Sequence, residues 1–237
     1  MSNHPSNQID TWAVFISVHT PKTGGSSVIA ALSEAFGNEY ILGDYADDPA
    51  NPISRASIDP SYFTKNPIRS LGKYKVVHGH FPAFKYKAVE GAFRMTFLRD
   101  PVENLVSIHH YWMSLEASPA ENPIQSYCRD NQLSVIDLAE IPALRYLYSK
   151  TYFGMDELRS FDFVGNYSCY NAELERLESR IGIPINKNIW INKTSEVDKS
   201  GRNLTMRQHN QSDKQLLAEL SRLLKEDIDL YETYRGK

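Results

Sequence analysis

One short segment constrains the fold of this chain more than any other: His19-Thr20-Pro21-Lys22-Thr23-Gly24-Gly25-Ser26-Ser27. The residues before it, Trp12 to Val18, form an apolar, β-branched run that predicts a buried strand. The residues after it, Val28 to Phe36, place apolar side chains at helical spacing, so we expect a helix there. A turn that joins a strand to a helix and contains glycine, serine and lysine is typical of an anion-binding loop, because the free N–H groups and the dipole of the helix both favour negative charge.

We therefore expect this segment to bind a nucleotide-like phosphate or a sulfate. The two glycines allow the backbone to approach a ligand closely, while the lysine and the hydroxyl groups add charged and neutral donors. The loop residues that we expect to contact the anion are Lys22, Thr23, Gly24, Gly25, Ser26 and Ser27.

The rest of the chain alternates short apolar strands with helices. Strands are predicted at Tyr74 to His78, Phe93 to Leu98 and Phe161 to Gly165. Helices are expected after residue 100, after the strand at residues 161–165 and near the C-terminus. The second of these carries Leu174, Leu177 and Ile181 on one side, and Gly182 followed by Pro184 predicts its end. In the last, Ser212 and Gln215 form a capping box before a leucine-rich stripe. This alternation predicts an α/β fold with three layers, α/β/α, around a mainly parallel sheet, in which ligands bind at the carboxyl ends of the strands.

Other segments lack a clear period. Tyr40 to Asn66 is rich in Asp, Pro and Ser, and we expect a long irregular excursion of the kind that often forms a lid. Ile185 to Asn210 is mostly polar, and we expect a loop that folds over a ligand. Between residues 116 and 156 the pattern is helical but broken.

Length, charge and cysteine content limit the class of protein. A chain of 237 residues is most simply one domain, here with a flexible N-terminus over residues 1–11. The net charge of −3 argues against a general nucleic-acid-binding protein, and no apolar run approaches the roughly 20 residues that span a bilayer. Cys128 and Cys169 form no metal or disulfide framework, and the N-terminus lacks a signal-peptide pattern. We therefore expect a soluble, cytoplasmic protein, whose oligomeric state the sequence does not predict.

A second candidate anion site follows the predicted strand at Phe93 to Leu98. Arg99 leaves the end of that strand, and its guanidinium suits bidentate binding of a phosphate. Asp100-Pro101 then predicts the start of a helix, since Asp100 can cap it, Pro101 suits its first position and Glu103 completes a capping-box-like pair. Ser107 lies seven residues beyond Asp100, on roughly the same helix face, so its hydroxyl and Arg99 can share one phosphate.

The segment His78-Gly79-His80 carries two candidate proton-transfer groups. If the strand extends that far, a period of two places both histidines on the same face. A neutral imidazole has a pKa close to working pH and can accept the proton of a hydroxyl group. We favour His80 over His78 as the general base because it is nearer the strand end. The alternatives are a zinc pair, for which the cysteines offer no suitably spaced ligands, or two core histidines.

Together these segments resemble the sulfotransferase family. The loop at 19–27 is similar to the 5′-phosphosulfate loop of its carbohydrate-type members, which often has a His-Ile-Pro-Lys-Thr-Gly-Gly spelling. The run Phe97-Leu98-Arg99-Asp100-Pro101, with Ser107 beyond it, resembles the family's 3′-phosphate signature. The string His78-Gly79-His80 resembles the segment that carries the general base in the heparan sulfate type of uronyl 2-O-sulfotransferase. The three motifs follow the family order within about residues 12–112.

The resemblance implies transfer of a sulfuryl group from 3′-phosphoadenosine 5′-phosphosulfate to a hydroxyl group of a carbohydrate or small-molecule acceptor. The products are a sulfate ester and 3′,5′-ADP, and no metal is required. In this scheme Lys22 and the loop N–H groups stabilise the charge that develops on the leaving phosphosulfate, Arg99 and Ser107 hold the 3′-phosphate, and His80 activates the acceptor.

The same resemblance implies two further donor contacts. Phe161 to Gly165 is similar to the family strand that precedes adenine-contacting residues, which makes Tyr167 a candidate partner of the base. Lys193 and Arg202 lie where sulfotransferases often place a segment that closes on the 3′-phosphate.

Two other functions compete with this interpretation. A P-loop kinase or nucleotide hydrolase would use a similar turn, but its lysine follows the second glycine, whereas Lys22 precedes both. A non-enzymatic binding protein would keep the fold without the reaction, and the presence of both Lys22 and His80 argues against it.

Overall fold

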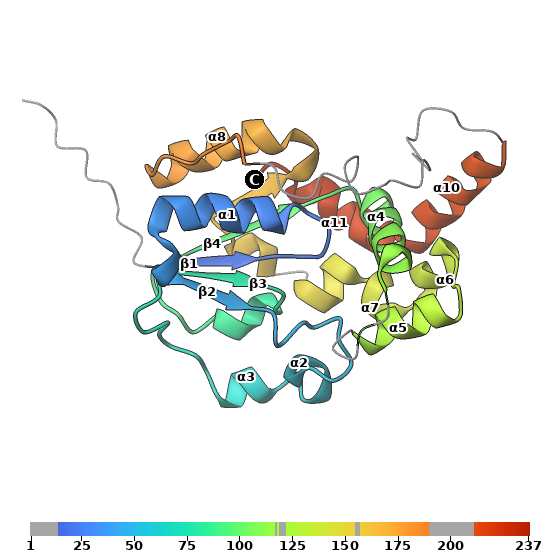
Figure 1. Ribbon diagram of the computed structural model, residues 1–237, viewed down its shortest axis with the longest axis horizontal. Helices are drawn as coiled ribbons and strands as arrows, with labels where there is room; N and C mark the ends of the chain where they lie inside the picture. The colour runs from blue at the N-terminus through green and yellow to red at the C-terminus, as the bar shows by residue number, and fades with distance from the viewer. Residues whose placement is uncertain (1–13, 117, 119–121, 155–156, 190–210) are drawn as a thin grey trace, which may run out of the picture.

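The computed structural model describes residues 14–116, 118, 122–154, 157–189 and 211–237. Within these ranges the strands form one five-stranded sheet in the order β2-β3-β1-β4-β5, and every neighbouring pair is parallel (Figure 1). The strands are β1 (Val14–Val18), β2 (Ile41–Asp44), β3 (Val76–Gly79), β4 (Ala92–Leu98) and β5 (Phe163–Asn166). The predicted α/β fold with a parallel sheet is therefore confirmed.

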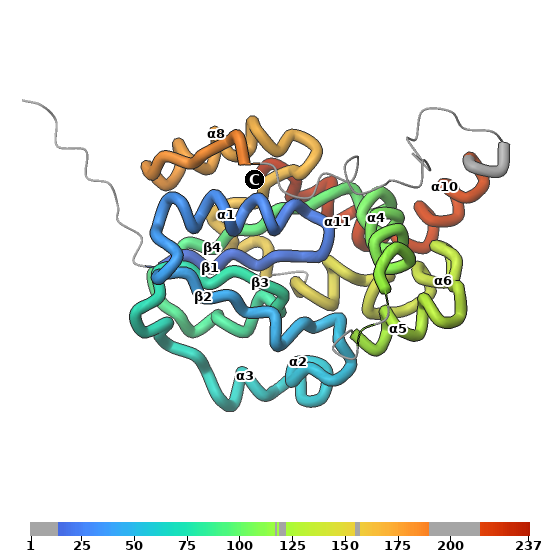
Figure 2. Tube along the Cα trace, in the orientation of Figure 1, coloured from blue at the N-terminus to red at the C-terminus, as the bar shows by residue number. Residues whose placement is uncertain are grey.

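Helices cover both faces of the sheet. On one face, α1 (Gly25–Phe36) and α8 (Tyr170–Ile181) lie side by side (Figures 1 and 2). The other face and the carboxyl end of the sheet carry α4 (Pro101–Ser114), α5 (Pro123–Asp130), α6 (Val135–Glu140), α7 (Pro142–Arg145), the π-helix η3 (Leu147–Tyr152), α10 (Gln211–Leu223) and α11 (Lys225–Tyr234). Among the described residues, no helix combines the length and apolarity needed to cross a bilayer.

The strands read as continuous apolar runs because both of their faces are buried. In β4, Phe93, Met95 and Phe97 point into the core beneath α1 and α8. The alternate residues Ala92 and Leu98 point into the larger core beneath α4, α6 and α11. This two-sided burial is the expected signature of a central parallel strand, and it explains why short apolar runs were sufficient to predict β1, β3, β4 and β5.

Two sequence signals for the ends of helices are also confirmed. The Asp100 carboxylate caps α4 by accepting the backbone N–H groups of Val102 and Glu103, both at 3.0 Å, and Pro101 occupies the first helical position. Gly182 ends α8 with a φ of 69°, a left-handed conformation that suits glycine. The capping-box role of Glu103 is wrong, because its carboxylate instead contacts Nε of Arg99 at 3.4 Å.

The segment Tyr40 to Asn66 is more regular than predicted. It contains the edge strand β2 and two single-turn helices, α2 (Arg55–Ile58) and α3 (Tyr62–Lys65). Strand β2 is four residues long and only its last residue is buried, so it carries no apolar run that periodicity could detect. Strand β2 lies at one end of the sheet and pairs on one side with β3, with Asp44 opposite Gly79.

A buried ion cluster holds the chain where β2 ends. The Lys85 ammonium, on the 3₁₀ turn η2 (Ala83–Tyr86), lies 2.6 Å from a carboxylate oxygen of Asp44 and 3.5 Å from one of Asp47. The Tyr86 hydroxyl donates to Asp44 at 2.7 Å. Because a buried charge is costly unless it is paired and hydrogen-bonded, this cluster ties the residues that follow β2 firmly to the body of the protein.

The C-terminal helix differs from the prediction in two ways. Within the described residues it begins at Gln211, which places Ser212 inside the helix and not at the capping position before it, and it is interrupted at Leu224, after which α11 begins. The predicted flexible residues 1–11 and most of the predicted loop 185–210 lie outside the described residues.

The break between α10 and α11 gives Asp227 a structural role. Its side chain, 1% exposed, accepts the backbone N–H groups of Tyr148 and Ser149 at 2.8 and 2.9 Å, at the start of η3. Burial raises the pKa of Asp227 to about 6, even though these hydrogen bonds favour the charged form. Asp227 therefore joins α11 to a helix whose first N–H groups have no helical partner.

We expect Asp227→Ala to lower the free energy of unfolding by about 2–4 kcal/mol, because it leaves two buried amides unpaired. Asp227→Asn retains one acceptor and should lose less. Between pH 4 and 6 the native carboxyl holds its proton more tightly than the unfolded one, so the stability of the unchanged protein should fall relative to Asp227→Asn as the pH rises through this window. Urea unfolding of the three proteins from pH 4 to 7 measures both effects, and a constant difference across the window would contradict the second.

Candidate functional site

The candidate site lies at the carboxyl end of β1, the central strand. From β1 the chain passes to β2 and β3 on one side of the sheet and then to β4 and β5 on the other, so the direction of strand order reverses at β1 (Figure 1). In open α/β sheets this reversal creates the crevice in which ligands bind. The predicted anion loop, the end of β3 and the end of β4 all meet there.

The loop is held by its own hydroxyl groups and by α4. Thr23, which is buried, donates its hydroxyl to the Thr20 carbonyl oxygen at 2.8 Å and also lies 3.2 Å from Nδ1 of His19. The buried Asn104 amide of α4 donates to the Pro21 carbonyl oxygen at 2.9 Å. Because the Thr23 hydroxyl already donates to a carbonyl oxygen of the loop, Thr23 would contact a ligand through its backbone N–H.

Both glycines of the loop are needed for its shape. Gly24 precedes α1 with a φ of 82°, and a Cβ there would come within 2.7 Å of the Tyr167 ring. A Cβ at Gly25 would overlap the imidazole of His19. Helix α1 consequently begins at Gly25, three residues earlier than predicted, and its first amides lie at the loop. Of the next two residues, Ser26 is exposed and Ser27 is buried.

Two cationic side chains converge on this loop. The ammonium of Lys22 lies 4.2 Å from the centroid of the Tyr111 ring, and the guanidinium of Arg99 lies 5.3 Å from the centroid of the Tyr167 ring. Burial and, secondarily, the positive charge of Arg99 lower the pKa of Lys22. Lys22 makes no ion pair with any residue in the described ranges. A bound anion would relieve the repulsion between the two cations, so the arrangement favours an anionic ligand.

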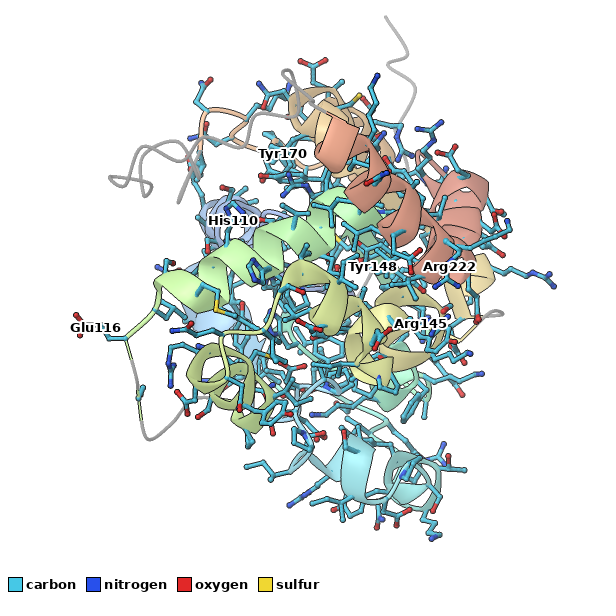
Figure 3. The ribbon with its side chains drawn as sticks, turned by 90° about the vertical axis from the view of Figure 1, so that its right-hand side faces the viewer. His110, Glu116, Arg145, Tyr148, Tyr170 and Arg222 are labelled. Carbon is cyan, nitrogen blue, oxygen red and sulfur yellow. The ribbon has the colours of Figure 1, made fainter. Side chains whose placement is uncertain are left out.

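The backbone of Arg99 is fixed by a tyrosine from another part of the chain. The Tyr148 hydroxyl accepts the Arg99 N–H at 3.2 Å and donates to the Arg99 carbonyl oxygen at 3.1 Å. Figure 3 shows Tyr148 in the packed region between α4 and the C-terminal helices. Farther along α4, Ser107 is partly buried, and its hydroxyl has no hydrogen-bond partner among the described residues.

A cluster of three histidines lies beside the loop. The imidazole of His19 stacks on that of His78, with ring centroids 5.2 Å apart, and lies 4.9 Å from that of His80. His78 is 1% exposed and its Nδ1 lies 2.9 Å from the Ser17 hydroxyl. Burial, together with the charge of His80, lowers the pKa of His78 to about 3, so this ring is neutral at ordinary pH. In the described part of the chain, no group of three or more His, Cys, Asp or Glu side chains is arranged to hold a metal ion.

His80 is more accessible than His78 and has acidic and aromatic neighbours. It follows the last residue of β3, and 22% of its side chain is exposed. Its Nδ1 lies 3.4 Å from a carboxylate oxygen of Asp48, and the ring of Tyr45 lies edge-on to it with centroids 5.1 Å apart. His80 therefore lies one residue beyond the strand, so the condition under which strand alternation would place the two histidines on the same face is not met.

The structure thus brings together most of the predicted site residues. Tyr167 reaches the site through its contacts with Gly24 and Arg99. Lys193 and Arg202 lie outside the described residues. Sequence reasoning missed the contributions of His19, Tyr45, Asp48 and Tyr111, and of Tyr152, whose hydroxyl donates to Asp48 at 2.8 Å. Of these, only His19 had a local signal, since it begins the anion loop.

Comparisons with known proteins give a limited result. No family model and no curated protein matches this chain. Among solved structures, it is similar to mouse sulfotransferase SULT7A1 complexed with PAP, at 12% identity over 89% of this chain and 84% of that chain, with a TM-score of 0.38. It is also similar to a sulfotransferase from Alicyclobacillus acidocaldarius, at 14% identity over 91% and 95% of the respective chains, with a TM-score of 0.40. The function must therefore be inferred from the residues of this chain and their arrangement.

We expect Gly25→Ala to destabilise the loop by about 1–3 kcal/mol, because the new methyl group displaces the His19 ring. Inorganic sulfate should raise the melting temperature of the unchanged protein but not that of the variant. Gly154→Ala is the matched control, since its Cβ would make an ordinary contact, 3.6 Å from Cγ of Glu157. Equal stabilisation of both variants by sulfate would contradict the role given to Gly25.

Proposed function

We propose that this protein transfers a sulfuryl group from 3′-phosphoadenosine 5′-phosphosulfate to a hydroxyl group of an acceptor. One observation carries the proposal: Lys22 and Arg99 converge on a loop at the start of a helix, while His80 is accessible at the end of the adjacent strand. The two cations and the loop suit a polyanionic donor, and the histidine suits an acceptor that must lose a proton.

The chemistry assigns a task to each side of the site. The acceptor oxygen forms a bond to sulfur while the bond between sulfur and the bridging oxygen of the phosphosulfate breaks. His80 takes the acceptor proton, and the electron pair of the broken bond stays on the 5′-phosphate of 3′,5′-ADP. Lys22 and the first amides of α1 stabilise that developing charge, the kind of contribution that typically accounts for a hundredfold or more in rate.

The far end of the donor is assigned to β4 and α4. Arg99 and Ser107 bind the 3′-phosphate, and Tyr167, which borders both Gly24 and Arg99, contacts the adenine. Binding the two ends separately orients the phosphosulfate for in-line transfer. Lys193 and Arg202 stay predicted contacts to the 3′-phosphate.

The choice of His80 over His78 as general base rests on exposure and hydrogen bonding. His78 is buried behind His19 and Ser17, and its low pKa makes it a weak base. His80 has an exposed edge and a carboxylate beside its Nδ1. A carbohydrate or small-molecule acceptor belongs to this proposal as its finer form, as does a cytoplasmic location.

A P-loop kinase or hydrolase fits the site less well. Such an enzyme would need an acidic residue at the end of β4 to hold magnesium, and Asp100 is the residue at that point. Its carboxylate is used to cap α4 through two backbone hydrogen bonds. Lys22 also lies on the strand side of the turn, before the glycines, with a φ of 63°.

A binding measurement separates these two functions. We expect 3′,5′-ADP to bind without magnesium and at least tenfold more tightly than 5′-AMP, because only the former carries the 3′-phosphate that Arg99 is proposed to hold. In Arg99→Ala the two nucleotides should bind with similar affinity. Isothermal titration calorimetry in EDTA measures both constants, and magnesium-dependent ATP binding without a 3′-phosphate preference would favour the kinase or hydrolase.

A transfer assay tests the catalytic assignment. With ³⁵S-labelled donor and a panel of hydroxyl-bearing acceptors, we expect Lys22→Met and His80→Ala each to lower kcat by about a hundredfold or more. His78→Ala should retain more activity than His80→Ala. Full activity in His80→Ala would show that another group takes the proton.

A further inference from the structure

The carboxylate of Asp48 uses its two oxygens for different purposes. Oδ1 accepts the backbone N–H of Ala50 at 2.9 Å and the hydroxyl of Tyr152 at 2.8 Å. Oδ2 faces Nδ1 of His80 at 3.4 Å. The first oxygen therefore holds the local backbone and joins it to η3, while the second is directed at the histidine.

The position of Asp48 is well defined. Its side chain is 20% exposed, and the residues just before it are tied down by the buried Lys85–Asp44–Asp47 cluster. Burial acts to raise the pKa of Asp48, but the hydrogen bond and charge of His80, with the bonds from Tyr152 and Ala50, outweigh it and hold the pKa below its usual value. Asp48 is thus an anion at neutral pH.

The ring of His80 has little freedom to turn. The rings of His19 and Tyr45 lie with their centroids 4.9 and 5.1 Å from that of His80, and the ring of Tyr152 lies 6.3 Å away in a T-shaped arrangement. With the ring orientation restricted in this way, the position of its proton decides which nitrogen can act as a base. A carboxylate beside Nδ1 favours the form protonated at Nδ1.

We propose that Asp48 is a positioning residue for His80: it accepts the Nδ1–H, so that Nε2 presents its lone pair to the acceptor hydroxyl. The effect of Asp48 on catalysis rests on the proposed function, whereas its effect on the position of the His80 proton does not. When Nε2 takes the proton, the imidazole becomes a cation beside an existing anion, which lowers the cost of forming it. Asp48 accepts a hydrogen bond and remains ionised throughout the reaction. The distance of 3.4 Å between Nδ1 and the carboxylate oxygen is at the long end of the range for a hydrogen bond.

Asp48→Asn tests this role with little change to the fold. The asparagine oxygen can keep the bonds from Ala50 and Tyr152, while its NH₂ group replaces Oδ2 and donates to Nδ1 of His80. The neutral imidazole must then carry its proton on Nε2, where it cannot accept one. We expect kcat to fall on the order of a hundredfold, with the Kd of 3′,5′-ADP and the KM of the donor unchanged.

The spectroscopic measurement does not require activity. In ¹⁵N-labelled protein at pH 8, long-range imidazole ¹⁵N–¹H spectra report which nitrogen of His80 is protonated, with His80→Gln identifying its signals. We expect the Nδ1–H form in the unchanged protein and the Nε2–H form in Asp48→Asn. Finding the Nε2–H form in the unchanged protein would overturn the proposal, whether or not the variant folds.

Asp47→Asn is the matched control. Asp47 is the adjacent residue, accepts the backbone N–H of Ala56 and lies 3.5 Å from Lys85. The variant keeps the shorter ion pair of Lys85 with Asp44, at 2.6 Å, and within the described residues Asp47 makes no contact with His80. It should keep both the Nδ1–H form of His80 and most of the activity. An equal loss of kcat in both variants with an unchanged His80 proton position would make the effect structural and refute the proposal. A shift of the proton in Asp48→Asn, in a protein that transfers no sulfuryl group, would support the positioning role and refute the proposed function.

Discussion

The direction of the strands is the constraint on which the rest of this structure depends. Because all five described strands are parallel, their carboxyl ends share one edge of the sheet, and every residue that follows a strand is delivered to that edge. The central position of β1 then places its loop between the ends of β3 and β4. Lys22, His80 and Arg99 meet for this reason, although they lie far apart in the sequence.

The site is divided by charge. On the β4 side lie the cations Lys22 and Arg99, and burial together with the charge of Arg99 lowers the pKa of Lys22. On the β3 side, buried His19 and His78 have pKa values well below the ordinary value, which keeps them uncharged and prevents them from adding to this repulsion. Of the three histidines, His80 alone has a carboxylate partner in the described part of the chain. In the proposed function, the first region binds the polyanionic donor and the second takes the proton of the acceptor.

Sequence reasoning was successful where a physical signal is local. A run of apolar residues predicts a buried strand, and Asp100-Pro101 or Gly182 marks a helix end, because the residues that cause the structure are adjacent in the chain. Strand β2 and the role of Asp48 had no such signal. Strand β2 exists because its backbone pairs with β3, and Asp48 matters because the fold brings it to His80 and Tyr152. The capping role predicted for Glu103 failed for the same reason, since Arg99 offers its carboxylate a charged partner.

The reciprocal hydrogen bonds between Tyr148 and Arg99 extend the influence of the site to the end of the chain. Tyr148 is held through its own backbone N–H by Asp227, so a path of three residues, separated in sequence by 49 and 79 positions, joins α11 to the proposed phosphate-binding arginine. The position of the Arg99 backbone is thus set in part by α11. Substitutions in α11 should therefore affect ligand binding as well as stability. A search confined to residues that line the site would overlook this helix.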